Sequence, residues 1–304
     1  MIPRKGLCLE THNTAMSLTF KLNDGAQIPW LGFGTGTALF NKDSTEAVKV
    51  AIQNGVTHLD GAQLYRNEES LGQGIKDSGV PREKLFVTTK LAETPSAPTI
   101  KATLEESLKK LGLDYVELFL IHSPVVALRE GKLKQWWKEM EEIKKEGLAK
   151  SIGVSNFTVE HLQIILEDAT VVPAVNQIEL HPYVWGVNSK VYSFCKDKGI
   201  VIESYGGLSP IVRAPGGPVD PVLASAAERL SKESGTTVSL GQVLSKWLIQ
   251  KDVVVVTTSS KVSRIKEALL TASLPDLTVD EISAIETEGS KVHKRFFMKH
   301  AFNE

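Results

Sequence analysis

The sequence predicts a (β/α)8 barrel, an α/β fold in which eight parallel strands, each followed by a helix, close into a cylinder. Three observations lead to this prediction. Short apolar runs alternate eight times with helical segments, the chain of 304 residues with 42% hydrophobic residues can bury one large core, and no Pro- or Ser-rich linker divides it. We therefore expect a single domain over residues 17–304.

Local signals predict the elements in order. A hairpin is expected across "FKLNDGAQIPWL", because Asp24-Gly25 is a strong turn signal. Helical segments include "STEAVKVAIQNG", "TIKATLEESLKKLG" and "LKQWWKEMEEIKKEG", which close on glycine as helices prefer, and additional helices are expected near the C-terminus. The strand candidates are "LGFG" (31–34), "THLD" (57–60), "LFVTTK" (85–90), "VELFLIH" (116–122), "SIGVS" (151–155), "AVNQIEL" (174–180), "VIESY" (201–205) and "VVVVTT" (253–258).

Residues 1–16, "MIPRKGLCLETHNTAM", are expected to form an extension before the domain. The segment is basic, but its apolar stretch "LCL" is too short for the core of a signal peptide. Met16 is a candidate for the original start.

The composition excludes several classes of function. A formal net charge of −1 gives no overall field to attract nucleic acid or an anionic membrane, and no apolar run approaches the length that spans a bilayer. Cys8 and Cys195 make no disulfide framework and no zinc spacing, so we expect no metal site, a cytoplasmic location and a Cys195 buried in a helix. The expected partner is a small molecule, and a monomer and a weak homodimer both remain open.

A doubly wound nucleotide-binding sheet is the competing fold, because "LGFGTGTA" places Gly32, Gly34 and Gly36 just after a strand. In a dinucleotide fingerprint the helix opens within the glycine motif, so that its N-terminus meets the pyrophosphate. Here the next helix is expected to begin near Ser44, well downstream. The barrel is therefore favoured, with the glycines allowing a close backbone approach at its mouth.

Four polar side chains are expected to converge at one end of this barrel. Asp60, Lys90 and His122 end the second, third and fourth predicted strands, and Tyr65 follows on the loop after the second. Neighbouring parallel strands bring their C-terminal ends together, and catalytic groups of such barrels gather there. Taken singly, these residues would be interpreted as a cap, a solvated lysine, a near-core histidine and a packed phenol. Their coincidence on one rim predicts an active site.

The four residue types suit the reduction of a carbonyl by hydride transfer. That reaction builds negative charge on oxygen, so it needs a proton donor that is protonated at neutral pH. A tyrosine has an unperturbed pKa of about 10, and a nearby lysine cation lowers it. Asp60 would hold Lys90 charged and oriented beside Tyr65, while His122 would hydrogen-bond the substrate oxygen.

With these residues identified, the sequence resembles the aldo-keto reductase family from about Leu18 to the C-terminus. The resemblance implies a (β/α)8 barrel, NADPH as cofactor, a small carbonyl substrate and a catalytic tetrad of Asp60, Tyr65, Lys90 and His122. The motifs that carry it are "DGAQLYRNE" (60–68), Lys90 after "FVTT", "LIHSP" (120–124), "IGVSNF" (152–157) and "VNQIELHP" (175–182).

The same resemblance implies a cofactor site. Ser155, Asn156 and Gln177 would hold the nicotinamide carboxamide and Tyr205 would stack on the ring, although alone Asn156 would be interpreted as a helix cap and Tyr205 as a packed aromatic. The segment "SSKVSR" offers hydroxyls, a point charge and a guanidinium fork for a 2′-phosphate. The expected cofactor residues are Gly34, Thr35, Asp60, Ser155, Asn156, Gln177, Tyr205, Gly207, Leu208, Ser259, Ser260, Lys261 and Arg264.

Some positions depart from the family pattern and predict the substrate class. Gly36 and Ser123 stand where tryptophan is common, the usual "YSPLG" reads "YGGLS" (205–209), and "VTTSSKVSR" (256–264) has no lysine directly after the last strand. These departures are similar to those of yeast reductases that act on α-keto amides and conjugated polyketones such as ketopantoyl lactone. The expected substrate pocket comprises Gly36, Tyr65, His122 and Ser123.

Other functions remain open at this point. If Phe296, Phe297 or Trp136 refill the pocket, the site would be of the aldehyde or aldose reductase type. A redox-sensing adaptor, like the potassium-channel β subunits, would use the same fold to bind partners, but the chain shows no long inactivation arm and keeps the tetrad whole. A non-redox barrel such as an isomerase would keep the topology without the nicotinamide residues.

Overall fold

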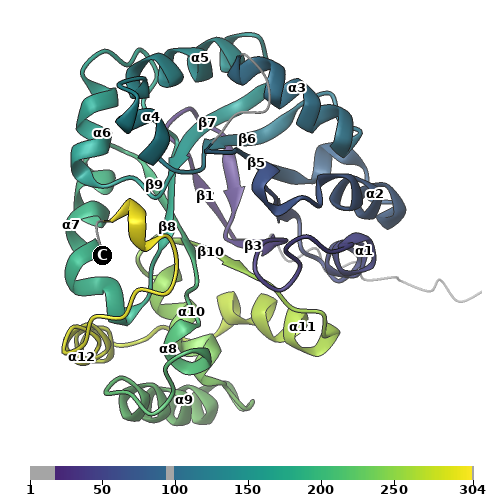
Figure 1. The fold of residues 1–304 in the computed structure, drawn as a ribbon. Helices are drawn as coiled ribbons and strands as arrows, with labels where there is room; N and C mark the ends of the chain where they lie inside the picture. The colour runs from purple at the N-terminus through teal and green to yellow at the C-terminus, as the bar shows by residue number, and fades with distance from the viewer. Residues whose placement is uncertain (1–17, 94–98, 303–304) are drawn as a thin grey trace, which may run out of the picture.

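The computed structural model describes residues 18–93 and 99–302, and it confirms the predicted barrel. Eight parallel strands close in the order β10-β3-β4-β5-β6-β7-β8-β9, and helices surround them (Figure 1). The strands are β3 (Leu31–Gly34), β4 (His58–Asp60), β5 (Phe86–Leu91), β6 (Val116–Ile121), β7 (Ala149–Ser155), β8 (Val175–Glu179), β9 (Val201–Tyr205) and β10 (Val254–Thr257). The expected extension, residues 1–16, lies outside the described residues.

The predicted helices are also present, with further ones near the C-terminus. The α-helices are α1 (Thr45–Gln53), α2 (Glu68–Ser78), α3 (Ile100–Leu111), α4 (Val125–Arg129), α5 (Leu133–Lys145), α6 (Val159–Leu166), α7 (Pro182–Asp197), α8 (Ser209–Val212), α9 (Asp220–Ser234), α10 (Leu240–Ile249), α11 (Val262–Leu270) and α12 (Val279–Gly289). Short 3-10 helices are η1 (Gln63–Tyr65), η2 (Arg82–Lys84), η3 (Thr271–Ser273) and η4 (Lys299–Ala301). Since α1 begins after Ser44, the helix does not open within the glycine motif, which excludes the dinucleotide fingerprint.

The expected hairpin forms from β1 (Thr19–Lys21) and β2 (Gln27–Pro29), which pair antiparallel around the Asp24-Gly25 turn. Its buried side chains Leu22 and Ile28 pack with Phe86, Val175 and Val254 in a cluster inside the barrel. Those three are the first residues of β5, β8 and β10, at the N-terminal end of each strand. The hairpin therefore closes that end of the barrel and leaves the C-terminal end for a site.

The barrel interior changes from apolar to polar toward the C-terminal end. Because alternate strand residues face inward, Phe86 at the hairpin end is followed on β5 by Thr88 and Lys90, and all are buried. On β4 the inward residues are His58 and Asp60, both buried. A Cβ atom added at Gly32 would lie 3.0 Å from His58 Nδ1, so this glycine leaves room for the imidazole ring.

Two other sequence-based expectations concern single features. Cys195 lies in α7 and is fully buried, as predicted, and burial raises the pKa of its thiol to about 12. Within residues 18–93 and 99–302, no helix combines the length and apolar character that crossing a membrane requires.

Candidate active site

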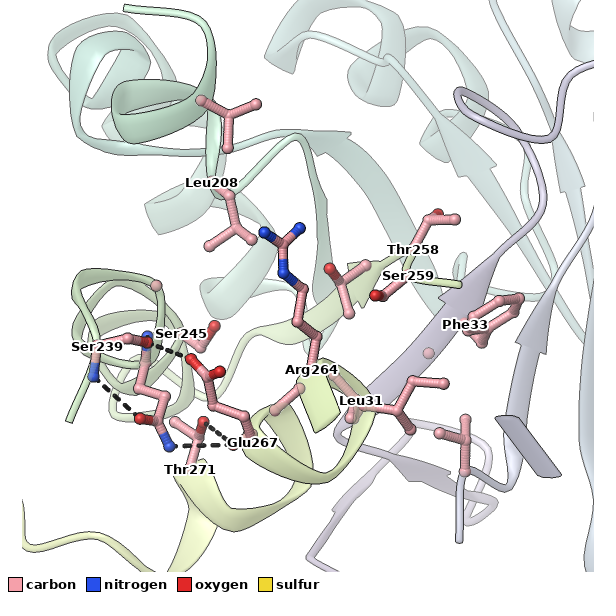
Figure 2. Close-up of a pocket in the computed structure, with 18 of the residues that line it drawn as sticks. Leu31, Phe33, Leu208, Ser239, Ser245, Thr258, Ser259, Arg264, Glu267 and Thr271 are labelled. Atoms are coloured by element: carbon pink, nitrogen blue, oxygen red, sulfur yellow. Dashed lines mark hydrogen bonds between the residues drawn. The ribbon is translucent and has the colours of Figure 1, made fainter. Parts of the chain in front are cut away.

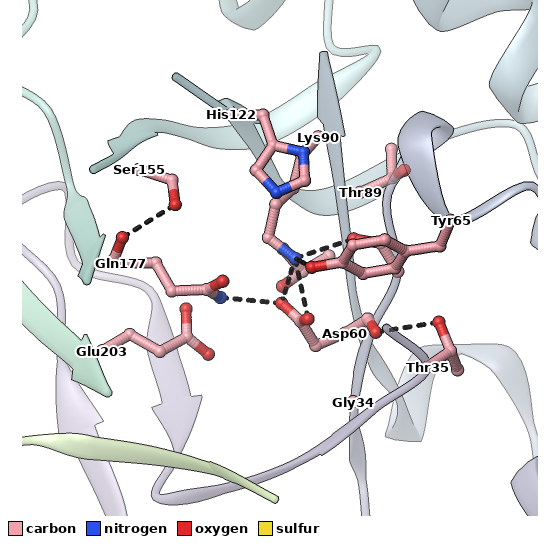
Figure 3. Close-up of polar contacts among 12 residues, drawn as sticks. Gly34, Thr35, Asp60, Tyr65, Thr89, Lys90, His122, Ser155, Gln177 and Glu203 are labelled. Carbon is pink, nitrogen blue, oxygen red and sulfur yellow. Dashed lines mark hydrogen bonds and ion pairs between the residues drawn. The ribbon is translucent and has the colours of Figure 1, made fainter. Parts of the chain in front are cut away.

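The barrel brings Asp60, Lys90, Tyr65 and His122 together at its C-terminal end (Figure 3). Lys90 Nζ lies 2.7 Å from each carboxylate oxygen of Asp60, 2.9 Å from the Gly61 carbonyl oxygen and 3.4 Å from the Tyr65 hydroxyl. The ring centres of Tyr65 and His122 are 5.5 Å apart and their planes stand at 81°. The four residues that the sequence singled out therefore share one site.

Strand register and local turns position these groups. Asp60 ends β4 and lies opposite Thr88 on β5, so Lys90 projects from two residues further along the same face. Tyr65 is the last residue of η1 on the loop after β4, and the helix ends at Arg66, whose φ of 55° is left-handed. On the other side of the carboxylate, the Gln177 side chain from β8 donates to Asp60 at 2.7 Å.

Burial, opposed by the Lys90 charge, raises the pKa of Tyr65 above the usual value for a phenol. The sequence argument expected Lys90 to lower this pKa, and the lysine does act in that direction. The net direction was wrong, because removing the phenol from water disfavours the phenolate more than the cation favours it. Tyr65 therefore stays protonated at neutral pH.

The imidazole of His122 is uncharged at neutral pH. Burial and then the nearby Lys90 cation lower the pKa of His122 to about 3. A neutral imidazole carries one N–H donor and one acceptor nitrogen. His122 can thus donate a hydrogen bond to an uncharged oxygen.

A cavity of about 670 Å³ opens directly above the four residues. Several predicted site residues line it, from the barrel rim and from the loop after β9: Gly34, Gly36, Asp60, Tyr65, His122, Asn156, Gln177, Tyr205, Gly207 and Leu208. The rest of the wall is largely apolar and includes Phe40, Leu64, Phe297 and Met298. The cavity combines an apolar wall with a few convergent polar groups, as small-molecule sites do.

Three predicted site residues lie behind the cavity wall. Thr35 is fully buried and its hydroxyl donates to the Asp60 carbonyl oxygen at 3.2 Å. The Ser155 hydroxyl donates to the Gln177 carbonyl oxygen at 2.7 Å and accepts from the Asn156 amide at 3.1 Å. Ser123 is 1% exposed, and its hydroxyl accepts a hydrogen bond from the Val125 N–H instead of facing the cavity. The prediction that Ser123 lines the substrate pocket is therefore wrong.

The amide groups expected to hold a carboxamide form their own network. Asn156 has a left-handed φ of 64°, and its amide nitrogen donates to the His122 carbonyl oxygen at 2.9 Å. The Tyr205 hydroxyl donates to Asn156 Oδ1 at 2.6 Å. These contacts fix Asn156 and Tyr205 at the edge of the cavity, beside His122.

A second cavity, of about 440 Å³, adjoins the first through the shared lining residues Leu208, Val212, Thr257 and Thr258. Figure 2 shows the Arg264 side chain reaching into it toward Leu208, with Ser259 beside it. Ser260 and Lys261 are exposed and line neither cavity. Of the four residues expected at a 2′-phosphate, the structure places Ser259 and Arg264 in the second cavity.

The structure places two residues of the C-terminal segment in the cavity wall: Phe297, which the sequence argument left open, and Met298, which it missed. Phe297 and Met298 line the first cavity because the buried Glu179 carboxylate accepts from the backbone N–H groups of Phe296 and Phe297, both at 2.9 Å. Of the aromatic residues considered for refilling the pocket, only Phe297 lines it, since Trp136 is buried in α5 and Phe296 packs near His181. Glu179 was within the quoted motif "VNQIELHP", but its tie to the C-terminal segment spans 117 residues.

The barrel and its polar site define the class of protein, and comparisons with known proteins agree. The family model described as the aldo/keto reductase family matches residues 30–288. This chain therefore belongs to the aldo/keto reductase family. It is an oxidoreductase of the kind that acts on carbonyl groups.

Three relatives illustrate the similarity. The chain is 42% identical over 286 residues to the NAD/NADP-dependent indole-3-acetaldehyde reductase of Schizosaccharomyces pombe, covering 91% of this chain and 97% of that protein. It is 35% identical over 289 residues to the NADPH-dependent alpha-keto amide reductase of Saccharomyces cerevisiae, covering 89% and 90%. A Bombyx mori aldo-keto reductase solved in complex with NADP superposes with a TM-score of 0.80 at 32% identity, covering 93% and 96%.

The Lys90–Asp60 pair makes a prediction about stability. Asp60→Asn should lower the free energy of unfolding by about 3 kcal/mol at pH 7, because it leaves the fully buried Lys90 cation without its carboxylate. Asp60→Asn combined with Lys90→Met should recover much of this loss, since neither charge is then buried. Urea unfolding of the three proteins measures both effects. Equal stability of Asp60→Asn and the unsubstituted chain would contradict the importance of the pair.

Proposed function

We propose that this chain is an NADPH-dependent carbonyl reductase in which Tyr65 is the general acid. The observation that carries the proposal is the buried Lys90 cation, held 2.7 Å from both oxygens of Asp60 and 3.4 Å from the Tyr65 hydroxyl. A cation beside a phenol stabilises the phenolate that proton donation leaves behind. The open cavity on the far side of Tyr65 gives a small carbonyl compound access to that proton.

The cofactor is NADPH, which supplies the hydride when bound. The side chains present fit it. Asn156 and Gln177 offer amide groups beside the Tyr205 ring in the first cavity, and Arg264 and Ser259 offer phosphate ligands in the second. The two cavities adjoin, so a molecule with a flat amide-bearing ring at one end and a phosphate at the other matches their order.

His122 and Tyr65 have different roles at the carbonyl oxygen of the substrate. Neutral His122 donates a hydrogen bond that orients the carbonyl and stabilises the charge developing on its oxygen. Tyr65 transfers its proton to that oxygen, and the phenolate that remains faces the Lys90 cation. Asp60 keeps Lys90 protonated, because burial alone would lower the pKa of the amine while the charge of Asp60 raises it. The net pKa of Lys90 is raised.

Tyr65→Phe tests the proton donor. The variant removes the hydroxyl while keeping the ring, so kcat for carbonyl reduction should fall more than about a hundredfold, as loss of a general acid does. NADPH binding, measured by fluorescence titration, should persist because Tyr65 is not assigned to the cofactor. Retention of more than about a tenth of kcat, a barrier change under about 1.4 kcal/mol, would exclude the role.

Arg264 and Ser259 are proposed to bind the 2′-phosphate of NADPH, with Ser260 and Lys261 at its exposed side. Arg264→Ala should weaken NADPH binding about tenfold and NADH binding much less, because a charge-assisted pair to phosphate is lost. Lys261→Ala is the matched control and should have the smaller effect, since its side chain lies outside the cavity. Equal losses for NADPH and NADH in Arg264→Ala would refute the assignment.

The proposed substrates are activated ketones: conjugated polyketones, ketopantoyl lactone and α-keto esters or amides. Gly36 lines the cavity without a side chain, and a Cβ atom there would lie 2.9 Å from the Tyr65 ring. The wall at this point is therefore backbone, which offers little apolar surface to grip an aldehyde. A carbonyl with an electron-withdrawing neighbour needs less binding energy to lower its barrier. The name of the alpha-keto amide reductase relative supports the same class.

Two observations favour a second candidate, an aldehyde reductase. Phe297, Phe40 and Leu64 line the same cavity and offer apolar surface to an aryl or alkyl group. The Schizosaccharomyces pombe relative, named for an aldehyde substrate, is 42% identical to this chain. The adaptor and isomerase alternatives have no such support, because the chain keeps the whole tetrad.

A substrate panel decides between the two candidates. We expect kcat/KM with NADPH to be higher for ketopantoyl lactone and isatin than for a simple aryl aldehyde or an aldopentose. Phe297→Ala is an informative companion, because it should reduce activity on the aldehyde more than on the dicarbonyls. A preference of the unsubstituted chain for the aldehyde or the sugar would replace the activated-ketone assignment with the second candidate.

A cytoplasmic location, a monomeric or weakly dimeric state and a small molecule as partner stay predictions from the sequence. Fluorescence microscopy of the tagged protein and sedimentation velocity of the purified chain test the first two.

A further inference from the structure

Glu203 is a fully buried carboxyl group inside the barrel that the proposed mechanism does not use. It lies on β9 between the hairpin end and the active site, opposite Gln177 on β8 and Val254 on β10. Figure 3 shows its carboxyl beneath Gln177, on the side of Asp60 away from Lys90. Neither carboxyl oxygen accepts a hydrogen bond of normal geometry within the described part of the chain, although the Gln177 amide lies close enough to favour the ionised form.

The ionisable groups around Glu203 come from three elements. His58 and Asp60 project from β4, Lys90 from β5, and Tyr65 from η1. His58 Nε2 lies 3.6 Å from Glu203 Oε1 and 3.0 Å from the Thr88 hydroxyl. Strand β8 contributes the Gln177 amide and ends at Glu179, whose carboxylate accepts from the backbone N–H groups of Phe296 and Phe297, while β3 and β10 contain no ionisable side chain.

This interior holds two carboxyl groups and one cation. Lys90 donates to both oxygens of Asp60, and Gln177 also donates to Asp60, so the hydrogen bonds that stabilise a carboxylate are concentrated there. The imidazole of His58 supplies no second cation, because burial lowers its pKa to about 4. An ionised Glu203 would be a buried charge without a partner, which is costly.

The electrostatics agree with this geometry. Burial and then the Asp60 charge raise the pKa of Glu203 to about 8, against the opposing effects of Gln177 and Lys90. Among the charges that act on Tyr65, Glu203 raises the pKa of the phenol and Lys90 lowers it.

We propose that Glu203 holds a proton at neutral pH, so that Lys90 faces one negative charge instead of two, and that ionisation of Glu203 at alkaline pH weakens Tyr65 as an acid. This inference rests on the proposed role of Tyr65. Glu203 is a positioning residue in this scheme, because it acts on the reacting groups through Asp60 and Lys90. When Glu203 ionises, the added negative charge opposes formation of the Tyr65 phenolate, and reduction slows before Tyr65 itself titrates.

The pH profile of reduction tests the proposal. In the unsubstituted enzyme, saturating NADPH and ketone should show kcat falling about tenfold between pH 7 and pH 9, the effect of one charge several ångströms away in a partly polar interior. Glu203→Gln cannot ionise, so its ratio of kcat at pH 9 to kcat at pH 7 should stay near one. Glu203→Asp keeps a carboxyl group and should restore an alkaline step.

Glu68→Gln is the matched control. Glu68 is also a buried carboxyl whose pKa is raised by burial, but it accepts hydrogen bonds from Thr89 and Ser107 and is not among the charges that act on Tyr65. This control should keep the alkaline step. Superimposable profiles for the unsubstituted enzyme and Glu203→Gln would overturn the proposal, and so would loss of the step in Glu68→Gln.

A second measurement needs no turnover. Carbon-13 NMR of chain labelled at the glutamate carboxyl carbon should show one resonance, missing from both Glu203 variants, that remains in the protonated position at pH 7 and titrates near pH 8. A Glu203 resonance already ionised at pH 6 would overturn the proposal. If the unsubstituted chain reduced no carbonyl compound, the proposed function would fail, while the NMR titration would still decide whether Glu203 holds the proton.

The pH dependence of the free energy of unfolding also reports whether Glu203 holds a proton. The folded-state pKa of Glu203 lies above its unfolded value, so the unfolded chain releases this proton first as the pH rises. Stability contributed by the neutral carboxyl is present below the unfolded pKa and is lost progressively up to about pH 8. Urea midpoints of Glu203→Gln should therefore fall less between pH 5 and pH 8 than those of the unsubstituted chain, and equal falls would contradict the proposal.

Discussion

The contact between Lys90 and Asp60 is the constraint on which the rest of the structure depends. Removing an ammonium and a carboxylate from water costs several kcal/mol for each ion, so a buried pair persists only with close geometry and further hydrogen bonds. Lys90 meets this condition with both Asp60 oxygens at 2.7 Å and the Gly61 carbonyl at 2.9 Å, while Gln177 holds the outer side of the carboxylate. Strands β4, β5 and β8 must therefore keep their places around the barrel for the pair to exist.

Burial determines the charge state of the groups around the Lys90–Asp60 pair. Because Lys90 is already paired with Asp60, the other ionisable groups in this interior have no counter-ion of their own. Burial therefore shifts the pKa values of His58, His122 and Glu203 toward their neutral forms. Close packing makes the arrangement specific, because a Cβ atom at position 32 would lie 3.0 Å from His58 Nδ1, whereas Gly32 leaves room for the ring. The polar interior therefore behaves as one electrostatic unit with the Tyr65 hydroxyl at its edge.

The sequence predicted the barrel well, because parallel strands buried on both faces give short apolar runs and the surrounding helices give a 3.6-residue period. It also predicted that Asp60, Lys90 and His122 meet at one end of the barrel, since strand ends are visible in the sequence and the ends of neighbouring strands lie together. It did not predict which way a side chain faces, so Ser123 was expected in a pocket although its hydroxyl accepts from a backbone N–H. Glu203 could have been noticed in the sequence, because it is a lone carboxyl group within the apolar run "VIESY". The position of Phe297 could not, because it depends on a contact with Glu179, which is far away in sequence.

Acidity and substrate choice are set by different parts of this molecule. Under the proposed function, the strength of Tyr65 as an acid is governed by the Lys90, Asp60 and Glu203 charges inside the barrel. The wall that a substrate does touch is built partly by the C-terminal segment, where Glu179 fixes the backbone at Phe297 and the ring packs against Tyr205 and Arg213. A buried carboxylate with charge-assisted hydrogen bonds therefore ties this part of the wall to the end of β8. Under the proposed function, substitutions at Phe297 or Met298 would therefore change which carbonyl compound is accepted without disturbing the Lys90–Asp60 pair.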